Sequence, residues 1–196
     1  MLLLGVSVLL SACAKEETAG QGPATAAEDT YPTSILAGQT TDDGILHVDF
    51  SPHLYFTGEP WPYNDTIYLD LDSDQVNDFM LKFTMSDPSM LGHDHMTMDI
   101  IPLGTNQVCV SPEDGSLAEP LVLDAVIDDS RTWSRDSTII YHYSSSQAGG
   151  WTTVGYFHGL NEYYIGVKFN TNGQVRYGWL KICTNCVEEY AITTAY

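Results

Sequence analysis

Regularly spaced acidic residues between positions 70 and 78 are the part of this sequence with the clearest chemistry. In the segment DLDSDQVND, carboxylates stand at positions 1, 3, 5 and 9, and position 7 is Val76, which can offer its backbone carbonyl. Carboxylates this close together repel one another unless a cation neutralises them, and Ca²⁺ takes about six to eight oxygen ligands. The segment therefore predicts a calcium site built from Asp70, Asp72, Asp74, Val76 and Asp78.

The residues on both sides of this segment are typical of β-strands rather than of helices. Apolar residues precede it at 67–69 and follow it at 79–81, and Leu81 stands where an EF-hand has its glutamate. The D-x-D-x-D-x-x-x-D spacing between strands resembles the calcium hairpin of integrin-type FG-GAP repeats and of secreted Bacteroidetes proteins, with Gln75 in place of the usual glycine. The resemblance implies a structural calcium ion that holds a hairpin; the alternative is an acidic turn without a metal.

A second candidate metal site lies in the segment 90–98, MLGHDHMTM. His93 and His95 form a His-x-His pair that can chelate Zn²⁺ or Cu²⁺, and methionine thioethers suit Cu(I). In a regular strand, however, Met96 and Met98 lie on the face opposite the histidines. A copper or zinc site at His93, His95, Met96 and Met98 is therefore an alternative hypothesis to an ordinary strand at 95–103.

The first thirteen residues carry a candidate export signal. The apolar run at 2–10 is too short to span a membrane and suits the core of a secretory signal. The residues LSAC at 10–13 resemble the bacterial lipobox, which implies removal of residues 1–12 and attachment of lipid, including palmitate, to Cys13. The alternative is a plain secretory signal. The following AKEE resembles the surface-export signal of Bacteroidetes lipoproteins and implies a lipid-anchored protein exposed at the surface of the outer membrane.

Cys109, Cys183 and Cys186 remain after lipidation. An exported protein meets oxidising conditions, so some pairing is expected. Two pairings are open: Cys183 with Cys186, which leaves Cys109 buried and free, or Cys109 with one of the other two. A zinc site at these cysteines would need further ligands that the sequence does not visibly supply.

The remaining chain divides into a tether and one domain. Residues 13–30 are rich in Ala, Gly, Thr, Gln and Glu without apolar periodicity, which indicates a flexible linker. From 31 to 196, apolar residues alternate at 46–50, 67–71, 79–83 and 121–127, and no segment keeps a 3.6-residue apolar period. We therefore expect an all-β fold, an antiparallel β-sandwich over residues 31–196.

The segment 164–182 indicates a hairpin, because Asn172-Gly173 separates two alternating runs. Its YIGVKF and YGWLKI runs resemble a hairpin of uncharacterised secreted β-proteins, many from Bacteroidetes, in which the calcium hairpin often comes earlier in the chain. We expect Trp179 to fill the core, with Gly178 allowing close packing; the alternative is an aromatic face for sugar stacking.

Composition excludes some functions. The chain has 26 acidic and 7 basic residues and a net charge of −19, which excludes nucleic acid as a partner. No nucleophile elbow, phosphate loop, zinc-protease motif or dinucleotide-binding pattern is present, so we expect no enzyme.

We expect a module for adhesion, assembly or ligand capture at the cell surface, with the membrane as partner through its lipid and a glycan or envelope protein as its ligand. A carbohydrate-binding module is the alternative if Trp61, Trp151 or Trp179 forms an exposed platform.

Overall fold

A computed structural model describes residues 31–57, 63–86, 95–145, 151–155, 163–171 and 173–195. These ranges contain strands and turns and no helix, which confirms the predicted all-β fold. None of the described residues belongs to a helix that could cross a membrane. Both expected N-terminal segments, with Cys13, lie outside the described residues, as do Trp61, Met90, His93 and Asn172.

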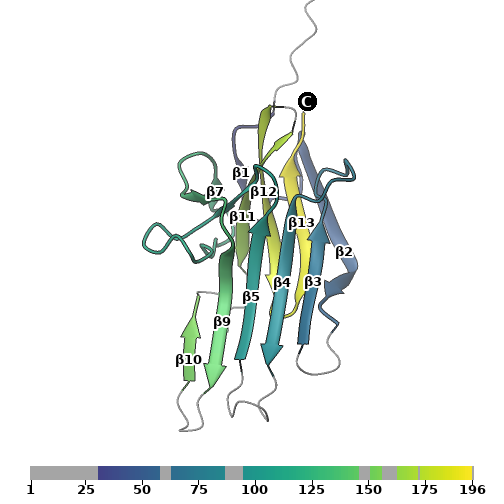
Figure 1. The fold of residues 1–196 in the computed structure, drawn as a ribbon. Helices are drawn as coiled ribbons and strands as arrows, with labels where there is room; N and C mark the ends of the chain where they lie inside the picture. The colour runs from purple at the N-terminus through teal and green to yellow at the C-terminus, as the bar shows by residue number, and fades with distance from the viewer. Residues whose placement is uncertain are drawn as a thin grey trace, which may run out of the picture.

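Two antiparallel sheets lie face to face (Figure 1). The first sheet has five strands in the order β10-β9-β5-β4-β3. Their bounds are β3 (Tyr63–Leu69), β4 (Phe79–Ser86), β5 (His95–Pro102), β9 (Thr138–Ser145) and β10 (Trp151–Val154). This sheet is formed largely by neighbours in the chain, because β3 and β4 form one hairpin and β4 pairs next with β5.

The second sheet has six strands in the order β2-β13-β12-β11-β6-β8. Their bounds are β2 (Ile45–Tyr55), β6 (Gln107–Cys109), β8 (Trp133–Ser134), β11 (Tyr164–Thr171), β12 (Gln174–Cys183) and β13 (Cys186–Thr193). The predicted 164–182 hairpin is β11 and β12, and Gly173 at its turn has a φ of +82°. A separate pair is formed by β1 (Ile35–Leu36) and β7 (Val126–Ile127).

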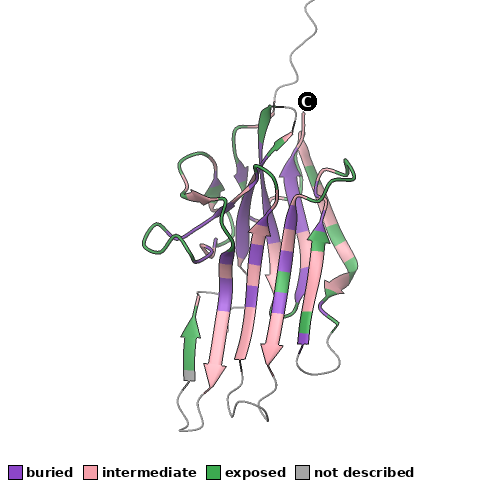
Figure 2. Ribbon diagram, in the orientation of Figure 1, coloured by how far each residue is buried: buried purple, intermediate pink, exposed green. Residues whose placement is uncertain are grey.

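The core lies between the two sheets and follows the alternation of the strands. Phe79, Leu81 and Phe83 of β4 are buried, as are Met98 and Ile100 of β5, so that buried and partly exposed residues alternate along the front strands (Figure 2). Because successive side chains of a strand point to opposite faces, β4 and β5 contribute alternate residues to this core. In β11 and β12 consecutive residues are buried, because both faces of these strands are covered.

Trp179 is buried, as predicted, and is 0% exposed. It packs in a second buried cluster with Ile35 and Ile127, on the face of the second sheet that points away from the first sheet, because its neighbour Leu180 packs between the sheets. Gly178 beside it permits the close approach of β13, because a Cβ at this position would lie 2.6 Å from the carbonyl oxygen of Ala191. Trp179 therefore cannot form an exposed aromatic platform.

The strand expected at 121–127 is wrong for most of its length. Asp124 has a φ of +65°, and the N–H of Ala125 donates to the carbonyl of Val122 at 3.1 Å, so the chain turns there. Only Val126 and Ile127 form a strand, and Leu123 is exposed.

Candidate metal site

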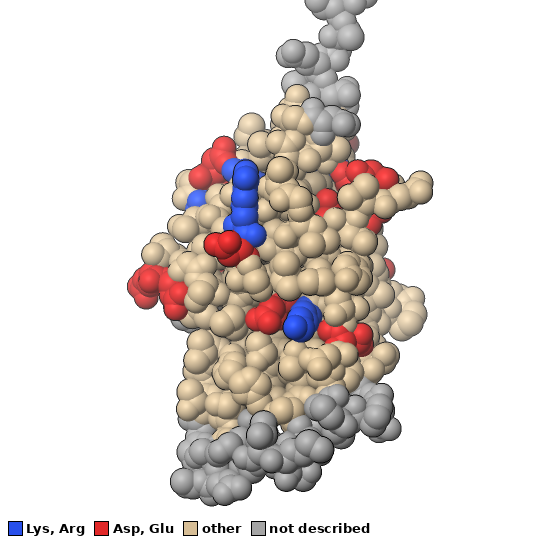
Figure 3. Space-filling view, in the orientation of Figure 1, with Lys and Arg blue, Asp and Glu red and all other residues tan. Residues whose placement is uncertain are grey.

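The acidic segment 70–78 connects β3 to β4, in the strand-turn-strand setting that the sequence predicted. Asp70, Asp72 and Asp78 each offer a carboxylate oxygen, and these oxygens lie within 4.8 Å of one another. The face seen in Figure 3 carries separate small groups of acidic side chains rather than one continuous acidic surface. This cluster of three carboxylates, which we call the acidic turn site, could hold a metal ion.

Asp74 is the one predicted carboxylate that does not join the acidic turn site. The carboxylate of Asp74 accepts the N–H of Val76 at 2.7 Å, and Asp74 is outside the three-carboxylate cluster. The side chain of Val76 is exposed, so this residue has only its backbone to offer. The two-residue spacing of the carboxylates does not by itself point Asp74 toward the other two aspartates. One of its carboxylate oxygens instead accepts a hydrogen bond from the backbone of the same turn.

The backbone of the turn is curled around Asp70. Its carboxylate accepts the N–H of Asp74 at 3.2 Å and the N–H of Gln75 at 2.8 Å. Ser73 and Gln75 adopt the left-handed region, with φ of 61° and 71°. Gln75 thus takes the conformation that glycine usually supplies at this position, at a cost of about 1 kcal/mol.

Asp72 is a buried carboxylate of the acidic turn site, with a side chain that is 5% exposed. Its Oδ2 accepts the hydroxyl of Thr171 at 2.7 Å and the guanidinium of Arg176 at 3.2 Å. Its Oδ1 is buried and has no hydrogen-bond partner. A buried polar atom without a partner is costly, and a cation bound between the three carboxylates would supply one.

The contacts of Asp72 also join the two sheets. Thr171 ends β11 and Arg176 lies in β12, both in the second sheet, whereas the acidic turn belongs to the first. Arg176 also donates to the carbonyl of Thr193 at 2.7 Å and stacks over the ring of Phe169 at 5.0 Å. The turn of one sheet therefore docks on the hairpin of the other.

Asp78 closes the site from the β4 side. Its carboxylate accepts the N–H of Leu71 at 2.8 Å and the amide of Asn106 at 3.2 Å. Burial raises the pKa of Asp78, and the nearby charges of Asp72 and Asp70 act in the same direction, while these two hydrogen bonds partly oppose the rise. The acidic turn site thus holds negative charge that the described side chains do not fully balance.

Sequence reasoning missed Thr171, Arg176 and Asn106, which lie between 28 and 104 positions from their aspartate partners. One signal was present: Arg176 is one of only 7 basic residues and stands three positions after Gly173 of the Asn-Gly turn. Such long-range partners become visible only when the two sheets pack together.

The described residues of the histidine and methionine segment do not converge. Met98 is fully buried between the sheets, and Met96 accepts the hydroxyl of Tyr141 at 3.4 Å. His95 lies on the other face, where its ring centroid is 4.3 Å from that of His142. Of the predicted second metal site at His93, His95, Met96 and Met98, His93 lies outside the described residues, and the other three do not come together. Strand alternation places the His95 imidazole and the two thioethers on opposite faces.

The cysteines adopt the first of the two open pairings. Cys183 and Cys186 form a disulfide across the turn between β12 and β13, while Cys109 is free and buried. The Cys109 thiol donates to Glu119 at 3.2 Å, and burial raises its pKa. Cys109 is therefore a poor nucleophile and packs as a core residue.

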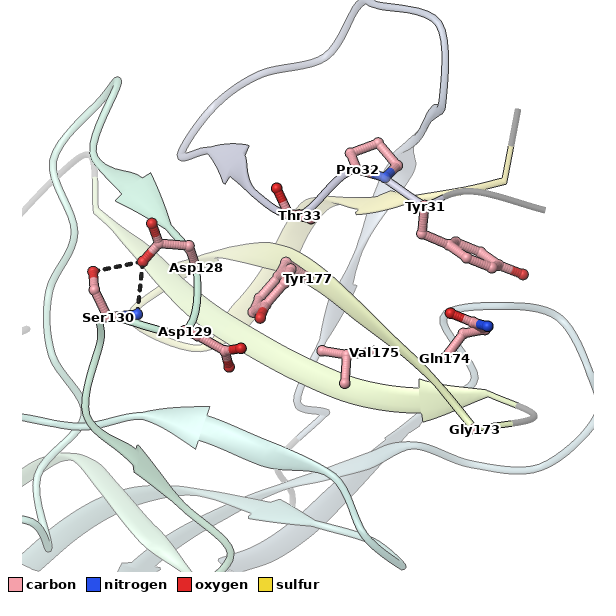
Figure 4. A pocket seen from close by; sticks show the side chains of 10 residues that line it. All are labelled: Tyr31, Pro32, Thr33, Asp128, Asp129, Ser130, Gly173, Gln174, Val175 and Tyr177. Atoms are coloured by element: carbon pink, nitrogen blue, oxygen red, sulfur yellow. Dashed lines mark hydrogen bonds between the residues drawn. The ribbon is translucent and has the colours of Figure 1, made fainter. Parts of the chain in front are cut away.

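A cavity of about 660 Å³ lies beside the start of β12 (Figure 4). Its lining combines aromatic rings with carboxylates, hydroxyls and an amide, from Tyr31, Pro32, Thr33, Asp128, Asp129, Ser130, Gly173, Gln174, Val175 and Tyr177. Asp128 is engaged within its own turn, because its carboxylate accepts both the N–H and the hydroxyl of Ser130. Asp129 is more exposed and pairs with Lys168 at 2.5 Å.

No similarity to a known protein indicates what this site does. The sequence matches no family model, and no curated protein or solved structure shows significant similarity to it. The acidic turn site and the contacts that surround it are therefore the basis for the function proposed next.

Proposed function

We propose that this chain is a non-catalytic, calcium-stabilised β-sandwich that acts in adhesion, assembly or ligand capture at the cell surface, held there by a lipid on Cys13. The single observation that supports it most is the buried, unpartnered Oδ1 of Asp72 in a cluster with Asp70 and Asp78. An unpartnered carboxylate oxygen close to two further carboxylates is the arrangement that a bound cation stabilises.

Calcium fits this cluster better than other common ions. The three clustered side chains are all carboxylates, and no histidine or cysteine belongs to the group. Oxygen ligands suit Ca²⁺ and Mg²⁺, whereas Zn²⁺ and Cu²⁺ favour nitrogen and sulfur. Ca²⁺ tolerates irregular geometry, which suits an irregular turn, while Mg²⁺ demands a near-octahedral site.

The role of the ion would be structural. Asp72 contacts Thr171 and Arg176 of the second sheet, so an ion at the acidic turn site would hold the first sheet against the second. Calcium sites in extracellular modules bind with dissociation constants of about 10⁻⁴–10⁻³ M, and a module at the cell surface would be filled from its surroundings.

Calorimetric titration and thermal unfolding of the purified protein in Ca²⁺, Mg²⁺ or a chelator test the proposal. We expect one Ca²⁺ to bind, Mg²⁺ to bind more weakly, and saturating Ca²⁺ at 100 times the dissociation constant to stabilise the fold by about 2.7 kcal/mol. Asp70→Asn and Asp78→Asn should abolish the heat of binding.

Asp114→Asn is the matched control, because Asp114 is an exposed carboxylate whose hydrogen bonds among the described residues come from Ser116 of its own turn. It should bind Ca²⁺ as the wild type does. Absence of a binding heat in the wild type, with a melting temperature that chelator leaves unchanged, would overturn the calcium proposal.

The lipid anchor has its own test. Cells that express the wild type should incorporate labelled palmitate into the protein and retain it in the membrane fraction, whereas Cys13→Ser should lose both properties. Cys109→Ser is the control, because that cysteine is buried in the domain. Equal labelling of wild type and Cys13→Ser would refute lipid attachment at Cys13.

Carbohydrate capture is a second candidate, favoured by the cavity of Figure 4. Sugars are bound by aromatic faces together with carboxylates and amides, and Tyr31, Asp129 and Gln174 supply these groups around one opening. We expect Asp129→Ala to weaken binding to a polysaccharide panel, while Asp114→Ala leaves it unchanged. If Asp129→Ala binds every polysaccharide as the wild type does, this cavity is not the carbohydrate-binding site.

A further inference from the structure

Three groups that bind transition metals meet at the end of the molecule opposite the acidic turn site. His53, Cys186 and Glu188 each offer one ligand atom, and these atoms lie within 4.8 Å of one another. The Nδ1 of His53 is 3.9 Å from the Sγ of Cys186. Cys186 is 1% exposed, while His53 and Glu188 are half-buried, so the cluster is partly shielded from solvent.

An irregularity in strand pairing creates this cluster. Along β13, Val187 pairs with Leu54, but Glu189 pairs with Asp49, so residues 50–53 of β2 stand opposite Glu188 alone. The extra residues form a bulge, which re-aims side chains that regular pairing would place elsewhere. His53, at the end of the bulge, thereby reaches the sulfur of Cys186.

In the oxidised chain the sulfur of Cys186 is bonded to Cys183 and cannot act as a thiolate ligand. We propose that reduction of this disulfide converts the cluster into a binding site for a transition-metal ion of the Zn²⁺ class, with His53, Cys186 and Glu188 as ligands. A dithiol supplies two electrons and two protons, becomes a disulfide itself, and leaves Cys183 and Cys186 as thiols. Metal binding then displaces the proton of the Cys186 thiol.

The distances and the donor set suit such an ion. Bonds of about 2.3 Å to sulfur and about 2.0 Å to nitrogen at a tetrahedral angle place the two ligand atoms about 3.5 Å apart, so a small side-chain movement from the observed 3.9 Å is enough. Thiolate, imidazole and carboxylate are the three ligand types that Zn²⁺ takes in proteins. Water or the freed Cys183 can occupy the fourth position.

Charge around the cluster permits a cation. Lys181 lies 3.3 Å from one carboxylate oxygen of Glu188, and it also pairs with Glu189 at 3.2 Å. Glu189 in turn contacts His47 at 2.7 Å. Lys181 therefore retains Glu189 as a carboxylate partner if Glu188 turns to the metal. The metal and the disulfide compete for the same sulfur, that of Cys186.

Cobalt titration of the full chain tests the proposal, because Co²⁺ bound to a thiolate gives a charge-transfer absorption. We expect no such band in the oxidised protein, a band after phosphine reduction and desalting without oxygen, and a band in Cys183→Ser without any reductant. Zn²⁺ should displace the cobalt. The Cys183→Ser variant keeps all three ligands and shows whether any loss of structure on reduction is responsible for a negative result.

Further variants assign the ligands. Cys186→Ser should abolish the band although Cys109 and Cys183 remain, and His53→Ala and Glu188→Gln should weaken cobalt binding more than about tenfold. His47→Ala is the matched control, a second β2 histidine next to a glutamate, and should not change binding. Asp70→Asn should not change it either, which separates this site from the calcium proposal.

Two results would overturn the proposal. One is equal cobalt binding by oxidised protein, reduced protein and Cys186→Ser. The other is absence of the charge-transfer band in both reduced wild type and Cys183→Ser while each retains the β-sheet circular dichroism of the oxidised protein.

Discussion

Two turns close hairpins at opposite ends of this sandwich, and they are held by different chemistry. The turn at 70–78 links β3 and β4 and gathers three carboxylates, while the turn at 183–186 links β12 and β13 and is crossed by a disulfide. Arg176, which contacts the acidic turn, and Cys183 stand near opposite ends of the same strand β12. One turn depends on charge balance and the other on a covalent bond.

The difference shows how closely each turn is coupled to the rest of the fold. The disulfide joins neighbours in the chain, so it constrains a short loop. The acidic turn instead contacts β11 and β12 of the other sheet through Asp72, so its energy includes the packing of the two sheets. We therefore expect changes at the acidic turn to affect the whole domain and changes at the disulfide to affect mainly its hairpin.

Arg176→Met should have the largest effect. It leaves the buried carboxylate of Asp72 without its cation and should lower the free energy of unfolding by about 3 kcal/mol in chelator, with part of the loss recovered in Ca²⁺. Urea denaturation measures both values. Arg131→Met is the control, because its pair with Glu119 is one-quarter exposed at each side chain, and it should cost about 1 kcal/mol or less. Equal losses in the two variants would remove the special role of Arg176.

Cys183→Ser should cost about 2 kcal/mol, because the disulfide closes a loop of only four residues. The loss should be the same in Ca²⁺ and in chelator, in contrast to Arg176→Met. Thermal unfolding at both conditions measures it. A calcium-dependent loss would show that the two turns are coupled through the sheet, and would contradict the expectation that the disulfide affects mainly its own hairpin.

Gln75→Gly should raise the free energy of unfolding by about 1 kcal/mol and tighten Ca²⁺ binding, because it relieves the left-handed backbone at φ 71°. Val76→Gly is the matched control at an exposed neighbour without a positive φ, and it should be slightly destabilising. Urea denaturation and calorimetry measure both. The same sign for both variants would mean that the backbone conformation of Gln75 is not the cause.

Asp99→Asn should have the smallest effect on the free energy of unfolding. It tests what a half-buried carboxylate costs in β5, away from both turns. Burial raises the pKa of Asp99 above its ordinary value of 3.8, while Lys82 opposite it lowers the pKa in part. The folded protein therefore holds this proton more tightly than the unfolded chain. The stability from protonation is complete below pH 3.8 and is lost as pH rises through the raised pKa.

We accordingly expect Asp99→Asn to gain roughly 0.5 kcal/mol at pH 7 and nothing at pH 3, with no change in Ca²⁺ binding. Urea denaturation at the two pH values measures the gain. A gain that disappears in Ca²⁺ would indicate that calcium relieves general acidic repulsion rather than acting at the acidic turn site.

Local patterns were sufficient for much of the fold. Alternation in 67–71 and 79–83 predicts β3 and β4, because the side chains of a strand follow a period of two regardless of its partners. Alternation failed at 121–127, where Asp124 turns the chain and Leu123 stays exposed. The apolar spacing there was coincidental, and no local signal separated it from a strand.

The features that could be predicted from the chain alone are short-range: most of the strands, the acidic spacing, the turn residues and the order in which they occur. The contacts of Arg176 and Thr171 with Asp72, and the bulge in β2 that brings His53 to Cys186, depend on how the strands pair and the sheets pack. These pairs, which are 99 to 133 positions apart in the chain, depend on which sheet faces meet and in which register. Those choices follow from the packing of the whole core, which no single segment encodes.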